Sequence, residues 1–154
     1  MNSIQVVLAI ASSHCSEVHE MDVKSAFLHG DLQEEIYMEQ PQGFIKDPTL
    51  VCHLRKSLYG LKQAPWAWYA KMDSFLLSVG FTWCHSNPYV YILQQGDSLL
   101  FLVLYVDDLL ITGSSSPTIK VVKVSLRKVS WWLTWACCIT FLGLRSFSLL
   151  LVWL

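Results

Sequence analysis

A single pair of acidic residues interrupts the most apolar stretch of the chain. Residues 99–112 read LLFLVLYVDDLLIT, and Asp107 and Asp108 break what would otherwise be one continuous buried strand. Burying one unpaired carboxylate costs several kcal/mol, and two adjacent carboxylates also repel each other. A turn at this point relieves part of that cost. The stretch therefore predicts a β-hairpin that carries both carboxylates at its tip.

The acidic tip has two interpretations. It is either an ordinary hairpin with a solvated acidic turn or a site for a divalent cation. Asp-Asp lacks the Asn-Gly or Asp-Gly chemistry that tight hairpin turns prefer, which favours a further role. Hard cations such as Mg²⁺ take oxygen ligands, often one or two carboxylates together with substrate phosphates.

Hydrophobic periodicity predicts a mixture of helices and strands. Apolar residues at helical spacing predict a helix over 67–79, which Gly80 ends. Period-two alternation predicts a short strand over 36–39. Gly113 and the three serines after it are expected to close the ordered part of the chain. The other expected elements are helices over 4–11 and 25–29 and strands over 17–23, 51–54, 89–93, 98–105 and 109–112. These elements predict an α+β fold with antiparallel strands grouped late in the chain.

Size, charge and cysteine content exclude several classes of protein. A chain of 154 residues forms one domain at most. Its formal net charge of -1 gives no global basic field of the kind that marks an autonomous nucleic-acid binder. The five cysteines contain no CxxC pair, so neither a zinc site nor a disulfide scaffold is expected. The apolar start lacks the basic segment and cleavage site of a secretory signal, so secretion is not expected.

Asp22 is the candidate for a third carboxylate. Two-metal phosphoryl transfer needs a further carboxylate to bridge ions that lie about 3.5–4 Å apart, and this residue can lie on a separate strand. Asp22 falls at the end of the expected strand 17–23, between Met21 and Val23. Its other interpretation is the N-cap of the short helix over 25–29. The residues alone leave both interpretations open.

Three motifs together resemble a known family. They are MDVKSAFLHGDLQEEIYMEQPQGF, VCHLRKSLYGLKQAP and FLVLYVDDLLITG, and they occur in this order. Within the third motif, residues 105–108 look like the YxDD box of reverse transcriptases. The order and spacing resemble the reverse transcriptase of copia-like long-terminal-repeat retrotransposons, from about Ile4 to Ser116. The resemblance implies a partial right-hand polymerase palm, an antiparallel sheet with packed helices.

The resemblance also implies the roles of the acidic residues. Asp22 corresponds to the first metal ligand, Asp107 to the second catalytic ligand and Asp108 to its neighbour. The implied cofactor is a pair of Mg²⁺ ions, with Mn²⁺ as a substitute. The implied partners are an RNA or DNA template with its primer and deoxynucleoside triphosphates, and no protein partner can be inferred. The implied location is a cytoplasmic virus-like particle or the nucleus.

A nucleotide pocket follows from the same resemblance. Val23 would offer a backbone carbonyl to the metal on the nucleotide side. Phe27 falls where such enzymes place an aromatic ring under the sugar to exclude a 2′-hydroxyl; its other interpretation is a core phenylalanine. Gln63 matches the residue that lies against the incoming nucleotide and the template base. Tyr105 and Val106 would pack beside the primer end.

The chain also departs from the family pattern. It opens almost at the first catalytic motif, so the upstream fingers are expected to be missing. Trp66 stands where the family has a basic residue, and an indole cannot reproduce the phosphate or carboxylate contacts of an arginine. Lys62 is interpreted either as a phosphate contact or as a solvated surface lysine.

The last residues form the third departure. From Trp131 the chain is almost wholly apolar, and Arg145 interrupts the run before it reaches the length of a membrane-spanning helix. Possible codons for Trp135 to Leu144, read in a shifted frame, give Gly-Leu-Leu-His-Tyr-Phe-Leu-Gly-Leu, which resembles the family's next segment. Residues 1–116 are therefore expected to form the partial reverse transcriptase region. Residues 117–154 are expected to be a frameshifted, irregular tail rather than a domain.

Three functions stay open from the sequence. The first is a fragment of an RNA-directed DNA polymerase from a Pol polyprotein, which transfers nucleotides to a primer 3′-hydroxyl and has little activity as this shortened chain. The second is a catalytically inactive remnant of a transposon. The third is a small protein that associates with membranes through its apolar tail, which the interrupted run argues against.

Overall fold

The computed structural model describes residues 3–129, 133–134 and 138–139. The chain forms two compact units, and each is described by itself. The sheet unit comprises Met1–Lys24 and Leu76–Leu154, and the hairpin unit comprises Ser25–Phe75. Helices and antiparallel strands occur in the same chain, which confirms the α+β fold class.

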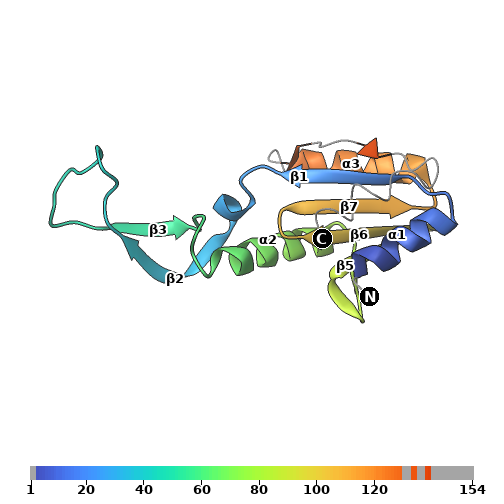
Figure 1. Cartoon of the computed structure of the whole chain (residues 1–154), viewed down its shortest axis with the longest axis horizontal. Coiled ribbons are helices and arrows are strands. Elements are labelled where there is room, and N and C mark those ends of the chain that lie inside the picture. Colours follow the sequence, from blue (N-terminus) through green and yellow to red (C-terminus); the bar gives the residue numbers. More distant parts are fainter. Residues whose placement is uncertain (1–2, 130–132, 135–137, 140–154) are drawn as a thin grey trace. The chain divides into compact units, whose positions relative to one another are not determined.

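An antiparallel sheet dominates the sheet unit. Its strands are β1 (Val18–Val23), β4 (Thr82–Cys84), β5 (Asn87–Gln95), β6 (Ser98–Tyr105) and β7 (Asp108–Gly113), followed by the two-residue strands β8 (Leu133–Thr134) and β9 (Cys138–Ile139). The strand order is β4-β5-β6-β7-β1-β8, and β9 also pairs with β1. Figure 1 shows β6, β7 and β1 side by side. The order brings an early strand, β1, next to the late acidic hairpin.

Helix α1 (Ser3–Ser13) covers one face of this sheet. Its buried residues recur at helical spacing and pack with residues of β1, β5 and β6 in one apolar cluster. The cluster comprises Ile4, Val7, Leu8, Ala11, Val18, Val90 and Val103. The helix predicted over 4–11 is therefore confirmed, with one further residue at its start and two at its end.

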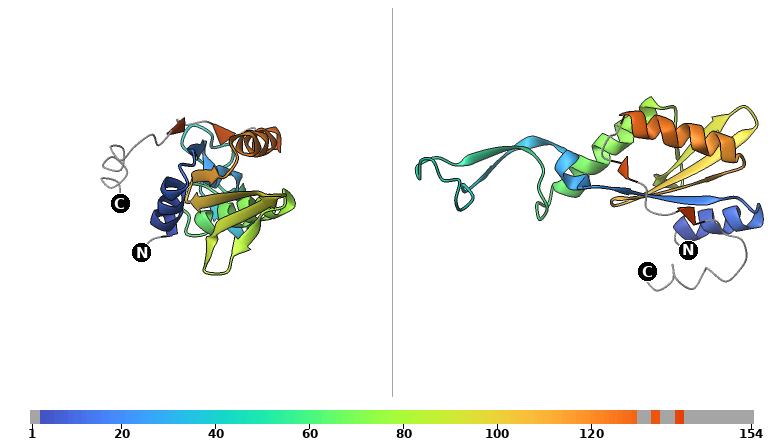
Figure 2. Two further views of the ribbon diagram at one scale, coloured as in Figure 1. Left: turned by 90° about the vertical axis from the view of Figure 1, so that its right-hand side faces the viewer. Right: turned by 90° about the horizontal axis from the view of Figure 1, so that it is seen from above.

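Helix α3 (Ser116–Val129) packs against the opposite face, where no helix was expected. Consecutive strand residues point to opposite faces, so Val18 faces α1 while His19 faces α3. Figure 2 shows the two helices on opposite sides of the sheet. Ile119, Val122 and Leu126 are buried at helical spacing. The expectation that the ordered part closes after Gly113 is wrong, because these three residues give α3 an apolar face to bury.

A buried polar contact joins α3 to β1. Lys123 Nζ lies 3.0 Å from His19 Nδ1, and both residues are buried. Because an ammonium group only donates, Nδ1 accepts, and Nε2 carries the proton that Glu17 accepts at 3.1 Å. Burial and the nearby lysine lower the pKa of His19, which keeps the ring neutral as this arrangement requires. Ser116 also donates to Glu17, at 3.1 Å.

The hairpin unit contains η1 (Ala26–His29), β2 (Asp31–Met38), β3 (Cys52–Lys56) and most of α2 (Ala64–Ser78). β2 and β3 pair antiparallel, with Ile36 opposite Leu54, so both short strands predicted here are confirmed. β2 begins at Asp31, five residues before the predicted start. Gly80 follows α2 with φ +100°, the conformation expected of a glycine that ends a helix.

No helix in the part of the chain that the structure describes is long and apolar enough to cross a membrane. Most of the apolar tail from Trp131 onward lies outside the described residues, and so does most of the segment interpreted as frameshifted.

Candidate active site

The acidic hairpin predicted from the sequence is present. β6 and β7 pair antiparallel with Tyr105 opposite Asp108, and residues 106–107 form the turn. β1 pairs with the other side of β7, and its register places Asp22 directly opposite Asp108. Directly opposed residues on neighbouring antiparallel strands have Cβ atoms about 4.5–5.5 Å apart. Two carboxylates that are distant in the sequence are therefore neighbours across one strand pair.

Asp107 is held at the same end of the sheet. Its carbonyl oxygen accepts a hydrogen bond from the Val23 N–H at 3.1 Å, which ties the turn to the end of β1. Figure 1 shows this turn and the end of β1 together. Tyr105 and Val106 are about half exposed beside it, at 49% and 52%. Asp22 lies near the end of β1 and is not the N-cap of η1. The N-cap position is occupied by Ser25, whose backbone is in the left-handed conformation and whose side chain makes no capping hydrogen bond.

Negative charge accumulates around Asp108. Its pKa is raised to about 6, first by burial and then by the charges of Asp107, Glu20 and Asp22. Glu20 and Asp22 alternate with Met21 along β1, so their side chains lie on the face that carries Asp108. The site therefore concentrates carboxylates whose repulsion a cation would relieve.

The donor set has the chemistry that a divalent hard cation requires. Carboxylate oxygens from Asp22, Asp107 and Asp108 are ligands of the type that Mg²⁺ takes. Among the described residues, however, no three His, Cys, Asp or Glu side chains are gathered closely enough to hold a metal ion as they stand. Ligation would therefore require these side chains to turn toward one another, which their half-exposed positions allow.

Val106 occupies a backbone conformation that disfavours its side chain. Its φ is +57°, in the left-handed region, which costs non-glycine residues about 1–2 kcal/mol and is least suited to β-branched ones. We expect Val106→Asn to raise the free energy of unfolding by about 1 kcal/mol, because asparagine tolerates this region and the half-exposed valine buries little. Urea unfolding of the full chain measures the change.

Val121→Asn provides the matched control for that prediction. Val121 is similarly exposed, at 60%, but lies within helix α3, where its backbone is ordinary. Asparagine there should give no gain, and a small loss from its lower helix propensity. If Val106→Asn is no more stable than the wild-type chain, the turn stores no strain.

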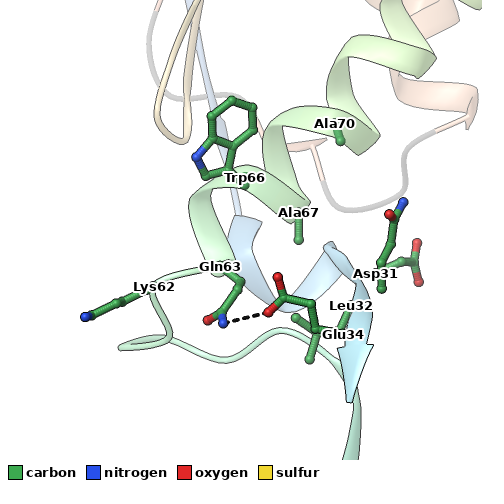
Figure 3. Close-up of a pocket in the computed structure, with 9 residues that line it drawn as sticks. Asp31, Leu32, Glu34, Lys62, Gln63, Trp66, Ala67 and Ala70 are labelled. Carbon is green, nitrogen blue, oxygen red and sulfur yellow. Dashed lines mark hydrogen bonds between the residues drawn. The ribbon is translucent and has the colours of Figure 1, made fainter. Parts of the chain in front are cut away.

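Two further predicted site residues lie in the hairpin unit. Phe27 is half-buried, and its ring centroid lies 5.1 Å from that of Tyr59 at an interplanar angle of 59°. Gln63 precedes α2, and its backbone carbonyl accepts the first helical hydrogen bond, from Ala67, at 2.9 Å. Its side-chain amide donates to Glu34 Oε2 at 2.8 Å. Figure 3 shows Gln63 and Glu34 at the edge of a pocket of about 370 Å³.

The structure brings together six of the eight predicted residues at one end of the sheet. These are Asp22, Val23, Tyr105, Val106, Asp107 and Asp108, whereas Phe27 and Gln63 belong to the other unit. Sequence reasoning missed Glu20 and Glu34. Glu20 had a signal, since a position two residues from Asp22 in a strand shares its face. Glu34 had none, because its contact with Gln63 joins segments that are far apart in the chain.

The family model of the reverse transcriptase (RNA-dependent DNA polymerase) matches residues 1–147. This match continues past residue 116, and the domain boundary expected there stays a prediction. No solved structure matches the chain.

Three curated relatives come from plant transposons. The chain is 50% identical over 131 residues to the retrovirus-related Pol polyprotein from transposon TNT 1-94 of Nicotiana tabacum, which covers 83% of this chain and 10% of that protein. It is 47% identical over 120 residues to the corresponding polyprotein from transposon RE2 of Arabidopsis thaliana, covering 77% of the chain and 8% of the relative. The polyprotein from transposon RE1 of the same plant is 48% identical over 119 residues, covering 76% and 8%.

The chain thus spans a tenth or less of the length of these relatives. The family match covers nearly all of it and includes the acidic hairpin and the strand that pairs with it. The chain therefore belongs to the reverse transcriptase (RNA-dependent DNA polymerase) family, among the copia-type retrotransposon Pol polyproteins.

Proposed function

We propose that this chain carries the palm active site of an RNA-directed DNA polymerase, which adds nucleotides to the 3′-hydroxyl of a primer. The observation that carries the proposal is the register that sets Asp22 opposite Asp108, beside the turn that holds Asp107. Family membership supports the reaction type, and the accumulated negative charge supports a requirement for cations. The activity of the whole polyprotein would need segments beyond this chain.

Asp22, Asp107 and Asp108 would hold two Mg²⁺ ions, with Mn²⁺ as a substitute. When bound, such ions lower the pKa of the attacking hydroxyl and neutralise charge on the phosphates. The protein's own part is positioning. The hydrogen bond from the Val23 N–H to the Asp107 carbonyl holds the turn against β1. By the family resemblance, the Val23 carbonyl would face the metal on the nucleotide side. Exposed Tyr105 and Val106 would contact the primer end.

Two residues of the hairpin unit match family positions that select the nucleotide. Phe27, whose ring packs against Tyr59, matches the aromatic residue with which the family excludes a 2′-hydroxyl. Gln63 is oriented by its hydrogen bond to Glu34, which directs its amide nitrogen to the carboxylate and leaves its oxygen as an acceptor. The proposed substrates are deoxynucleoside triphosphates on a primed template.

A second candidate is a catalytically inactive remnant of the same enzyme. The observation that favours it is Trp66, which is 76% exposed at the position where the family pattern has a basic residue. Losing that charge would weaken a phosphate contact without disturbing the acidic hairpin. The remnant would retain the fold and cation affinity but not turnover.

Cation binding tests the proposed site directly. We expect electron paramagnetic resonance of Mn²⁺ to show binding by the full chain and about tenfold weaker binding by Asp22→Asn, a loss of about 1.4 kcal/mol. Asp97→Asn is the matched control, because Asp97 is exposed in the turn between β5 and β6, at the opposite end of β6 from Asp107. Equal Mn²⁺ affinity in wild type and Asp22→Asn would contradict the assignment.

Primer extension separates the two candidates. On a poly(rA) template with an oligo(dT) primer, extension by the wild-type chain that Asp22→Asn abolishes would support the polymerase. Mn²⁺ binding without extension would support the remnant. Extension that survives Asp22→Asn would contradict the assignment of Asp22 as a catalytic metal ligand.

A further inference from the structure

An exposed tryptophan stands at the start of α2, within the hairpin unit. Trp66 is 76% exposed. Its ring makes a T-shaped contact with Tyr69, with the ring centroids 6.4 Å apart and the ring planes at 84°. This contact leaves most of the indole surface exposed. Figure 3 shows Trp66, Gln63 and Lys62 projecting from the beginning of α2 and the loop before it. The chain thus presents an aromatic face to solvent beside a cation and an amide.

The pocket beside Trp66 combines polar side chains with small apolar ones and Leu32. The same pocket is lined by Lys62, Gln63, Ala67 and Ala70, and the alanines leave space next to the indole. A protein partner would need a contact of about 1,000 Å² or more with an apolar centre, which one tryptophan among these residues does not supply. A flat, polar-edged ligand fits the arrangement better.

The charges near the pocket permit an anionic ligand. The Asp31 carboxylate pairs with Lys56 and lies 3.1 Å from Lys71 Nζ, so two lysines offset it. The Glu34 carboxylate accepts the amide of Gln63. Exposed Lys62 adds a further positive charge one turn before Trp66. Three lysines therefore accompany two carboxylates around this pocket.

We propose that Trp66 is a stacking platform for an unpaired base of a single-stranded nucleic acid. Lys62 meets an adjacent phosphate, and the Gln63 oxygen accepts from the base edge. Stacking on an aromatic side chain contributes about 1–3 kcal/mol per base, whatever the base, because every base has a π-face. The inference rests on the proposed function and deepens it. It assigns a contact with the unpaired template to Trp66, which stands where the family pattern has a basic residue.

Fluorescence anisotropy of a labelled single-stranded oligo(rA) tests the proposal, with the full chain in EDTA. We expect Trp66→Ala to weaken binding about 5- to 150-fold and Trp66→Tyr to stay within about threefold of wild type. Trp83→Ala is the matched control, because Trp83 is also exposed, at 54%, but lies on β4 in the sheet unit. It should bind like wild type. Lys62→Gln should reduce the slope of log affinity against log salt concentration by about 1, the effect of losing one phosphate contact.

An abasic strand of the same length separates stacking from backbone contacts. Wild type and Trp66→Ala should bind it equally, since it offers phosphates without bases. The proposal is overturned if wild type does not bind oligo(rA), if Trp66→Ala binds it as tightly as wild type, or if the loss is the same on the abasic strand.

The same assay separates this inference from the proposed function. The anisotropy measurement is made in EDTA, because stacking on Trp66 needs no cation. Trp66-dependent binding without Mn²⁺ binding at Asp22 would remove only the polymerase site. Mn²⁺ binding without any effect of Trp66→Ala would remove only the stacking platform.

Discussion

Gly30→Ala is expected to lower the free energy of unfolding of the hairpin unit by about 3 kcal/mol. A Cβ at this position would lie 2.8 Å from Ala67 Cβ, 2.9 Å from the Ala67 carbonyl carbon and 2.9 Å from Ser57 Oγ. One neighbour is helix backbone and another is a fully buried side chain, so neither can move aside cheaply. The φ of Gly30 is an ordinary -65°, so the effect is steric rather than conformational.

Hydrogen–deuterium exchange over residues 25–75 measures this loss, because it reports on the hairpin unit separately from the sheet unit. A second variant distinguishes overpacking from other causes. Ala67→Gly alone should cost about 1 kcal/mol as a glycine in a helix. In the Gly30→Ala background it should cost less or recover stability, because it removes one of the clashing atoms. Strictly additive losses, or a Gly30→Ala change within about 0.5 kcal/mol, would contradict the steric explanation.

The acidic hairpin was predictable because its cause is local. Two charges inside an apolar run must reach the surface, and a turn is the shortest way to bring them there. The partner of Asp108 is not a local property. Register is set by pairing between β1 and β7, which are far apart in the sequence, so the residues alone left the role of Asp22 open and only the family resemblance favoured a metal ligand.

Helix α3 shows the opposite situation. Ile119, Val122 and Leu126 carried a helical signal, but Gly113 and the serines after it indicated a loop. Lys123 lies on the same face of the helix, and a charged residue there argues against burial when only the sequence pattern is considered. The structure satisfies that charge with His19, a contact across more than a hundred residues that no local pattern reveals. Glu34 was missed for the same reason.

Removing one charge from the acidic tip should stabilise the fold at neutral pH. In the folded chain the pKa of Asp108 is about 6, against an ordinary value of 3.8, because burial and the charges of Asp107, Glu20 and Asp22 disfavour ionisation. That difference corresponds to at most about 3 kcal/mol, and solvent screening of the half-exposed carboxylate reduces it to about 1.5 kcal/mol. Asp108→Asn, which mimics the neutral acid, should therefore be more stable by about this amount at pH 7–8.

The pH dependence gives that prediction its sign. Well below pH 3.8 the carboxyl is neutral in folded and unfolded chains alike, so wild type and Asp108→Asn should be equally stable. As the pH rises from 3.8 to about 6, the unfolded chain ionises Asp108 while the folded chain still holds its proton, so wild type loses stability that the variant keeps, and the gap levels off above pH 6. Urea unfolding in EDTA at pH 3, 6 and 8 measures the widening gap. A gap that is constant or that narrows with pH would mean that the tip does not repel Asp108. A widening gap would show that the charge on Asp108, one of the carboxylates proposed to bind cations, destabilises the fold when no cation is present.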